Sequence, residues 1–287
     1  MVLSFTVSSK SSQHQSSISM SAPISLQTPS TAPPIHSTTV RMTKHSKTIT
    51  RRIRKKQNRI RDRIRPIVED LSARWLDFCA KRTSRRVVAI TPRDRFSFSS
   101  ESIYHVLHEY VPGVEFYNVR LALHEPHREG PLAPGCEIEE RFRKAVLTYN
   151  TCMDACVAFW EHLHKVFGAM DDFVGLEVRW QHVRPRFVLF PSTEVPDQET
   201  LFWHHYIVVT FRRGISFVLD FSGYQFGFSK VFYTLKQYED EVLDGTEYPE
   251  VEDVPALIEG EMEKAMSEQP SAKRRRAGEL FDLIFSL

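Results

Sequence analysis

The sequence predicts an α+β fold in which a helix that carries cysteine packs on an antiparallel sheet. Helical patterns dominate the first half of the ordered chain and strand patterns the second, so the two types do not alternate as they do in a parallel sheet. The clearest helix is expected at 151–167. The strand-like segments 202–211 and 215–226 are separated only by Arg212, Arg213 and Gly214, the pattern of a hairpin.

Composition narrows the class of protein. The chain has 287 residues, of which 41% are hydrophobic, which is enough for a substantial core. A net charge of +2 provides no general attraction to nucleic acid. Four cysteines are too few for a disulfide framework, and no apolar run reaches the roughly 18 residues of a membrane helix. We therefore expect an intracellular protein, nuclear or cytoplasmic, without a membrane partner.

Both ends of the chain differ in composition from the middle. Residues 1–60 begin rich in Ser, Thr and Pro and then become basic, so we expect this segment to be disordered. Residues 246–287 are acidic and then basic, and are expected to form a tail. The basic runs at 51–65 and 272–278 are either solvated linkers or contacts for a polyanion or a nuclear-import receptor.

The α+β domain is expected to cover residues 66–245. Pro66 suits the first position of a helix, and Ile67, Leu71, Trp75 and Phe78 follow at helical spacing. Further helices are expected at 100–111, 137–149, 151–167 and 229–243. Strands are expected at 85–90, 114–123, 173–183, 186–190, 202–211 and 215–226.

The helix at 151–167 carries two cysteines near its start. Thr151 can cap the helix, Asp154 suits the positive end of its dipole, and Gly168 ends it. Cys152 falls in the first turn, where free backbone N–H groups lower the pKa of a thiol most. Cys156 lies one turn deeper on the same face and is expected to pack beneath Cys152.

Two adjacent histidines compete to share a face of the hairpin with Asp220. A three-residue loop at 212–214 would pair Tyr206 with Asp220 and place His204 on the face of Asp220. A two-residue loop would shift the register by one residue and place His205 there instead. We favour His204, because a type I turn that ends on a left-handed Gly214 suits the longer loop.

The stretches "NTCMDACVAFWEHL", "WHHYIVVTF" and "FVLDFSGYQFG" together resemble the transglutaminase-like branch of the papain-like cysteine enzymes. In that family a buried helix presents the thiol, and a following hairpin presents histidine and aspartate. The resemblance covers roughly residues 140–230. It departs from the family at Thr151 and Met153, where Trp or Gly often flanks the nucleophile, and at Tyr206, where Trp is commoner.

This arrangement would support acyl transfer on a protein or peptide substrate, as in a peptidase, amidase, deamidase or transglutaminase. Cys152 would be the nucleophile, His204 or His205 the base, and Asp220 the group that orients the imidazole. An oxyanion would need donors, for which Asn150 and Gln225 are candidates, although Gln225 also suits a role in stabilising the turn. No cofactor and no metal are expected.

Three alternatives remain from the sequence alone. Cysteines and histidines of this kind can simply pack in a core. A zinc ion could be held by Cys152, Cys156 and one histidine, but adjacent strand residues face opposite ways, so at most three ligands converge. The domain could also be catalytically inactive and act as an interaction module through its basic runs. Alkylation of the thiol separates these cases, because only an activated thiolate reacts well below pH ~8.

Overall fold

The fold is given by a computed structural model, which describes residues 44–82, 85–93, 113–123, 137–191, 202–245, 249–257 and 259. The chain divides into two units, residues 1–55 and residues 56–287. Of the first unit only residues 44–55 are described, and they are helical. Everything that follows on packing concerns the second unit, which is α+β as the sequence predicts.

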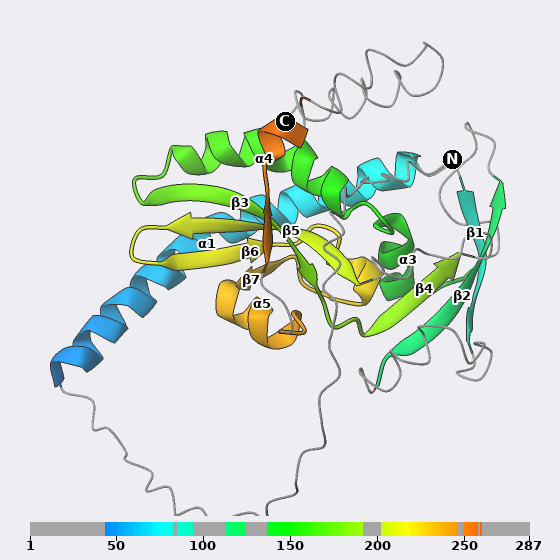
Figure 1. The fold of residues 1–287 in the computed structure, drawn as a ribbon, viewed down its shortest axis with the longest axis horizontal. Coiled ribbons are helices and arrows are strands. Elements are labelled where there is room, and N and C mark those ends of the chain that lie inside the picture. Colours follow the sequence, from blue (N-terminus) through cyan, green and yellow to red (C-terminus); the bar gives the residue numbers. More distant parts are fainter. Residues whose placement is uncertain are drawn as a thin grey trace, which may run out of the picture. The chain divides into compact units, whose positions relative to one another are not determined.

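The larger sheet has five strands in the order β7-β6-β5-β3-β8, and every neighbouring pair in it is antiparallel (Figure 1). Its strands are β3 (Phe173–His182), β5 (Trp203–Phe211), β6 (Ile215–Leu219), β7 (Phe232–Thr234) and β8 (Glu250–Glu252). The central strand β5 is buried along most of its length. A residue at the end of β5 can therefore meet groups from both layers that cover the sheet.

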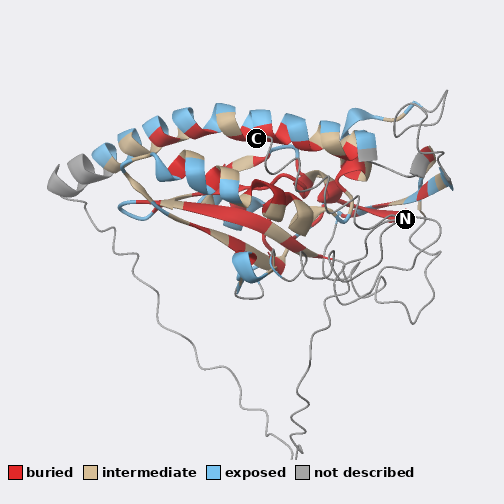
Figure 2. Cartoon of the chain, turned by 90° about the horizontal axis from the view of Figure 1, so that it is seen from above, coloured by how far each residue is buried: buried red, intermediate tan, exposed pale blue. Residues whose placement is uncertain are grey.

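Helices cover both faces of this sheet. Helix α4 (Cys152–Gly168) packs on one face together with α1 (Lys44–Arg82), and Trp75 of α1 meets Phe159 of α4 edge to face. Helix α5 (Leu235–Glu241) packs on the other face through Tyr238. Figure 1 shows α4 and α5 on opposite sides of the strands, and Figure 2 shows how thoroughly the strands are buried.

A second sheet has three strands in the order β1-β2-β4. Strands β1 (Arg85–Pro92) and β2 (Glu115–Leu123) are antiparallel, while β2 and β4 (Phe187–Pro191) run parallel. Helix α3 (Glu140–Leu147) packs against this sheet and leads through residues 148–151 into α4. The three-stranded sheet thereby anchors the segment that comes immediately before Cys152.

The first helix begins earlier than the sequence analysis places it. Pro66 lies inside α1, and residues 44–60, which were expected to be disordered, are helical. The buried stripe of the helix starts well before Pro66, with Ile60 and Ile64, and continues through Val68 and Leu71 at helical spacing. The energy of burying this stripe outweighs the loss of one backbone hydrogen bond at proline.

Residues 215–243 form more elements than expected. Strand β6 ends at Leu219, and residues 223–226 form the short 3₁₀ helix η2 (Gly223–Phe226). The single helix predicted for 229–243 is wrong, because β7 occupies its first part. Thr234 then starts α5 with a capping box in which its hydroxyl accepts from Gln237 N–H.

The expected tail at 246–287 also needs correction at its beginning. Residues 250–252 form β8, which adds to the edge of the large sheet beside β3. Val254 follows immediately and is completely buried in the core between α4 and the sheet. The acidic composition of this segment gave no sign that Val254 would be buried. Burial of this one apolar side chain stabilises the short edge strand.

Several predictions lie outside the described residues. These are the disorder of residues 1–43, the helix at 100–111 and the basic run at 272–278. In the ranges that the structure does describe, no helix has the length and apolar character required to cross a bilayer.

Candidate functional site

Cys152 is the first residue of α4 and is partly exposed, whereas Cys156 one turn later is 2% exposed. Thr151 occupies the N-cap position as predicted, but its side chain does not cap the helix. Its hydroxyl donates instead to the carbonyl of Thr148. The backbone N–H groups of the first turn therefore remain available to a negative charge on the Cys152 sulfur.

The hairpin register agrees with the three-residue loop. Phe211 pairs with Ile215, and Ile207 pairs with Leu219. The turn itself differs from the expected type, because Arg213 has a positive φ of 72° together with Gly214 at 68°. Turns of this mirror-image hand match the twist of antiparallel strands, and that match accounts for the strained arginine.

His204 and Asp220 lie together, as the register implies. His204 Nε2 is 2.8 Å from Asp220 Oδ1, and neither side chain has any exposed surface. The carboxylate also accepts hydrogen bonds from the Tyr238 hydroxyl, at 2.9 Å, and from the Ser222 backbone N–H, at 3.3 Å. A buried charge needs partners of this kind, so three donors hold one carboxylate in a fixed orientation.

The segment "DFSGYQFG" folds back on itself to build this arrangement. A Cβ atom at Gly223 would lie 2.8 Å from Asp220 Cγ and closer still to one carboxylate oxygen, so only glycine leaves room for the aspartate. Two residues later, Gln225 Nε2 is 3.4 Å from His204 Nδ1. Gln225 Oε1 accepts the backbone N–H of Asn150 at 2.8 Å.

Gln225 thus links the start of α4 to His204. Of the two expected oxyanion donors, Gln225 is 8% exposed and lies in the site through its amide. Asn150 is exposed, has a positive φ of 55°, and uses its backbone N–H on Gln225. Among the described hydrogen bonds, Asn150 contributes to the site through its backbone and not through its side chain. Gln225 stabilises the turn at Asn150 by accepting this backbone N–H.

Both histidines affect the pKa of the thiol. Cys152 Sγ is 3.5 Å from His205 Nδ1, whereas the two ring nitrogens of His204 face Asp220 Oδ1 and Gln225 Nε2. Burial by itself would raise the pKa of Cys152, but the two neighbouring imidazoles lower it well below its usual value. Cys156 is affected in the opposite sense, because burial and the charge of Cys152 raise its pKa well above normal.

The surroundings of His204 raise the pKa of its imidazole. Burial would lower the pKa of His204, yet the charge and hydrogen bond of Asp220, with a further contribution from Cys152, raise it to about 10. The lowered pKa of Cys152 and the raised pKa values of the two histidines all favour a thiolate beside an imidazolium. This ion pair is the reactive form of a nucleophilic cysteine.

The sequence analysis did not identify three residues of this site. Tyr238 binds Asp220, Glu252 lies 3.5 Å from His205, and Trp180 stacks on His205 with an interplanar angle of 10°. The register of β3 against β5 could have revealed Trp180, which pairs directly with His205. Tyr238 and Glu252 carry no local signal, since each reaches the site from a separate element.

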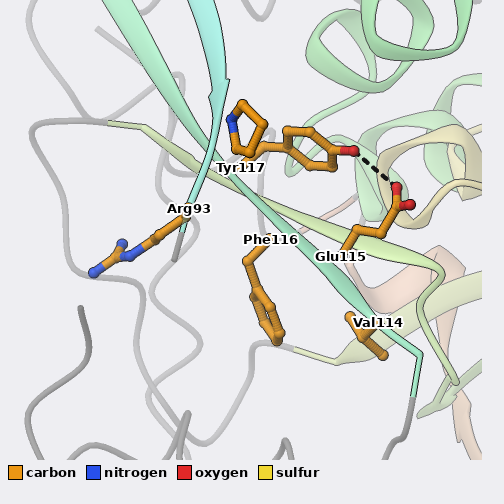
Figure 3. Close-up of a pocket in the computed structure, with 6 residues that line it drawn as sticks. Arg93, Val114, Glu115, Phe116 and Tyr117 are labelled. Atoms are coloured by element: carbon orange, nitrogen blue, oxygen red, sulfur yellow. Dashed lines mark hydrogen bonds between the residues drawn. The ribbon is translucent and has the colours of Figure 1, made fainter. Parts of the chain in front are cut away.

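The small sheet carries a cavity whose lining residues lie away from Cys152 in the chain. The cavity has a volume of about 290 Å³ and is lined by Pro92, Arg93, Val114, Glu115, Phe116 and Tyr117 (Figure 3). Its described lining residues include no cysteine or histidine, and the Tyr117 hydroxyl donates to Glu115 at 2.8 Å. Across the described ranges, no three His, Cys, Asp or Glu side chains are grouped to hold a metal ion.

Comparison of the whole chain with family models, with curated proteins and with solved structures gives no match.

Proposed function

We propose that this protein is a cysteine-dependent acyl-transfer enzyme of the transglutaminase-like kind. One observation carries the proposal: the Cys152 sulfur lies at the start of α4, 3.5 Å from His205 Nδ1, and the adjacent His204 is fixed by the buried Asp220. A thiol that served only as core packing would not need an imidazole nitrogen directed at it, nor a second imidazole next to the first that is bound to a buried carboxylate and, through it, to a tyrosine hydroxyl.

The groups present can divide the chemistry of acyl transfer between them. The Cys152 thiolate attacks a carbonyl carbon, and a C–S bond forms while the carbonyl π electrons move to oxygen. Collapse of this tetrahedral intermediate breaks the bond to the leaving group, which takes a proton from an imidazolium. Water or an amine then attacks the thioester and gives its proton to the neutral imidazole, and the thiolate is released.

The negative oxygen of the intermediate needs donors. The backbone N–H of Cys152 at the helix start is one, and the Gln225 amide beside His204 is the second. Asp220 keeps the His204 ring oriented, and Tyr238 keeps Asp220 in place. We propose a protein or peptide as the acyl donor, in the classes of peptidase, amidase, deamidase or transglutaminase.

Alkylation by iodoacetamide tests the proposal without knowledge of the substrate. Wild-type Cys152 should be labelled faster than a free thiol at pH values below ~8, because a free thiol titrates near ~8.5 and the pKa of Cys152 is lowered by its imidazole neighbours. Cys156→Ala should leave the rate unchanged, and Asp220→Asn should slow it at low pH. Labelling that follows an ordinary thiol titration, with no effect of Asp220→Asn, would contradict an activated nucleophile.

A further inference from the structure

The imidazole that contacts the thiol, His205, is not the imidazole that binds Asp220. His205 presents Nδ1 to the Cys152 sulfur at 3.5 Å, and its other nitrogen, Nε2, lies 3.5 Å from Glu252 Oε1. Trp180 stacks flat on the ring, with 5.6 Å between ring centroids. His205 is therefore held between a carboxylate and an aromatic face, with one nitrogen directed at the reacting atom.

The two histidine–carboxylate pairs occupy different environments. The side chains of His204 and Asp220 are 0% exposed, whereas those of His205 and Glu252 are 11% and 27% exposed. Neighbouring strand residues point to opposite faces, so the two pairs lie on different faces of β5. One pair lies wholly inside the protein, and the other lies where a bound leaving group could reach it.

The charges around His205 suit a proton donor. Burial would lower the pKa of His205, but hydrogen bonds to Cys152 and Glu252 raise it, against the opposing charge of His204. The contact with His205 in turn lowers the pKa of Glu252. The groups that face His205 are thus Cys152 from α4, Glu252 from β8 and His204 from β5.

We propose that His205 and Glu252 form an acid–base pair at Cys152 that protonates the leaving group, and that this pair is distinct from the buried pair of His204 and Asp220. This inference rests on the proposed function. In the acylation step, the leaving-group oxygen or nitrogen takes the proton on His205 Nδ1 as its bond to carbon breaks. In deacylation, the incoming water or amine returns a proton to Nδ1 as it attacks the thioester carbon, and the electron pair of the C–S bond returns to sulfur.

Glu252 reaches this site from outside the helix and hairpin that carry the other groups. It belongs to β8, which pairs with β3 at the sheet edge, where Val178 is its partner. The C-terminal segment therefore completes the proton-transfer pair, although its acidic composition resembles that of a solvated tail. Glu252 is a positioning residue, which acts on the reaction through His205.

Two esters with different leaving groups separate the roles of the histidines. p-Nitrophenolate leaves as a stable anion. Phenol is about as weak an acid as the tyrosine side chain, with a pKa near ~10, so phenolate departs more readily when it is protonated. Acetylation of Cys152 by p-nitrophenyl acetate and by phenyl acetate would be followed by mass spectrometry in the full-length chain. Each rate would be divided by the iodoacetamide rate, which depends on the thiolate but needs no proton donor.

His205→Gln should slow normalised acetylation by phenyl acetate roughly 100-fold, as the loss of a general acid does, and change the p-nitrophenyl acetate rate by less than about threefold. Glu252→Gln should show the same selectivity with a smaller loss, and Glu252→Asp should recover part of it. Glu250→Gln is the matched control, because Glu250 is exposed on the same strand opposite Trp180. In the wild type, the phenyl acetate rate should also fall at high pH, and His205→Gln should abolish that fall.

Each outcome separates the two proposals. If neither ester acetylates Cys152 in the wild type, the proposed function fails, and the second pair fails with it. If acetylation occurs but His205→Gln and Glu252→Gln affect both esters equally, the second pair is overturned and the proposed function stands. If His204→Gln rather than His205→Gln produces the leaving-group effect, His204 is the proton donor and the inference is wrong. Should His205→Gln not fold, the isosteric Glu252→Gln decides the same question.

Discussion

Replacement of Gly223 by alanine adds a single methyl group to the site and tests whether Asp220 lies where the structure places it. The new Cβ would lie 2.8 Å from Asp220 Cγ and closer still to Oδ2, where ordinary contact begins at 3.4 Å, so the carboxylate must retreat by at least about 0.6 Å. Asp220 cannot retreat without loss, because its oxygens already bind His204 at 2.8 Å and Tyr238 at 2.9 Å. The strain therefore falls directly on the groups that orient the imidazole.

Two magnitudes follow from this geometry. Overpacking of a buried site destabilises a protein by about 1–3 kcal/mol, and we expect Gly223→Ala to lose a similar amount. A misplacement of about 1 Å can reduce a rate roughly 100-fold, so a shift of about half that size should slow labelling of Cys152 roughly 10-fold at pH 6.5. The slowing should diminish above pH ~9, where an ordinary thiol is ionised without help.

The assay combines chemical denaturation with iodoacetamide labelling across pH. Gly168→Ala is the matched control, because Gly168 ends α4 without positive φ and an added Cβ there meets no atom within 4 Å. That variant should keep both the stability and the labelling profile of the wild type. If Gly223→Ala also behaves as wild type, Asp220 does not occupy the space above Gly223, and its role as the orienting group is refuted.

Three further predictions concern single positions. Tyr238→Phe removes a hydrogen bond to the buried carboxylate of Asp220 and should lower the free energy of unfolding by about 1.5–3 kcal/mol in urea titrations; no change would mean that water replaces the hydroxyl. Ile64→Ala should lower the free energy of unfolding by about 2–5 kcal/mol, because Ile64 is 0% exposed in the helix before Pro66. The control Arg63→Ala, at an exposed position, should change it by less than about 0.5 kcal/mol. Equal effects of the two changes would mean that this part of α1 does not pack on the core. The pKa of His204 is raised to about 10 in the folded state from about 6.5 in the unfolded state. Its stabilising contribution is therefore complete below pH ~6.5 and is lost as the pH rises through about 10. The difference in unfolding free energy between wild type and His204→Asn should shrink over that interval, and a constant difference would argue against a charged His204.

The sequence alone predicts the α+β class and the helix that starts at Cys152, and it favours the observed register of the β5–β6 hairpin over the alternative that a two-residue loop would give. These features depend on local information: apolar periodicity, the length of the loop before Ile215, and the alternation of side chains along a strand. They are sufficient to bring His204 and Asp220 to one face. The prediction that a helix begins at Pro66 was wrong. Burial of the apolar stripe along α1 stabilises a continuous helix by more than proline favours a helix start.

Only the tertiary structure decides which groups surround the thiol. Tyr238 reaches Asp220 because α5 packs on the face of the sheet opposite α4, and Glu252 reaches His205 because Val254 anchors β8 at the edge. Neither contact has a spacing or a composition that marks it in the chain, since both depend on where distant elements are buried. A strand specifies which way its side chains point, but the packing of separate layers determines what they meet there, and for Cys152 that packing supplies the second histidine–carboxylate pair.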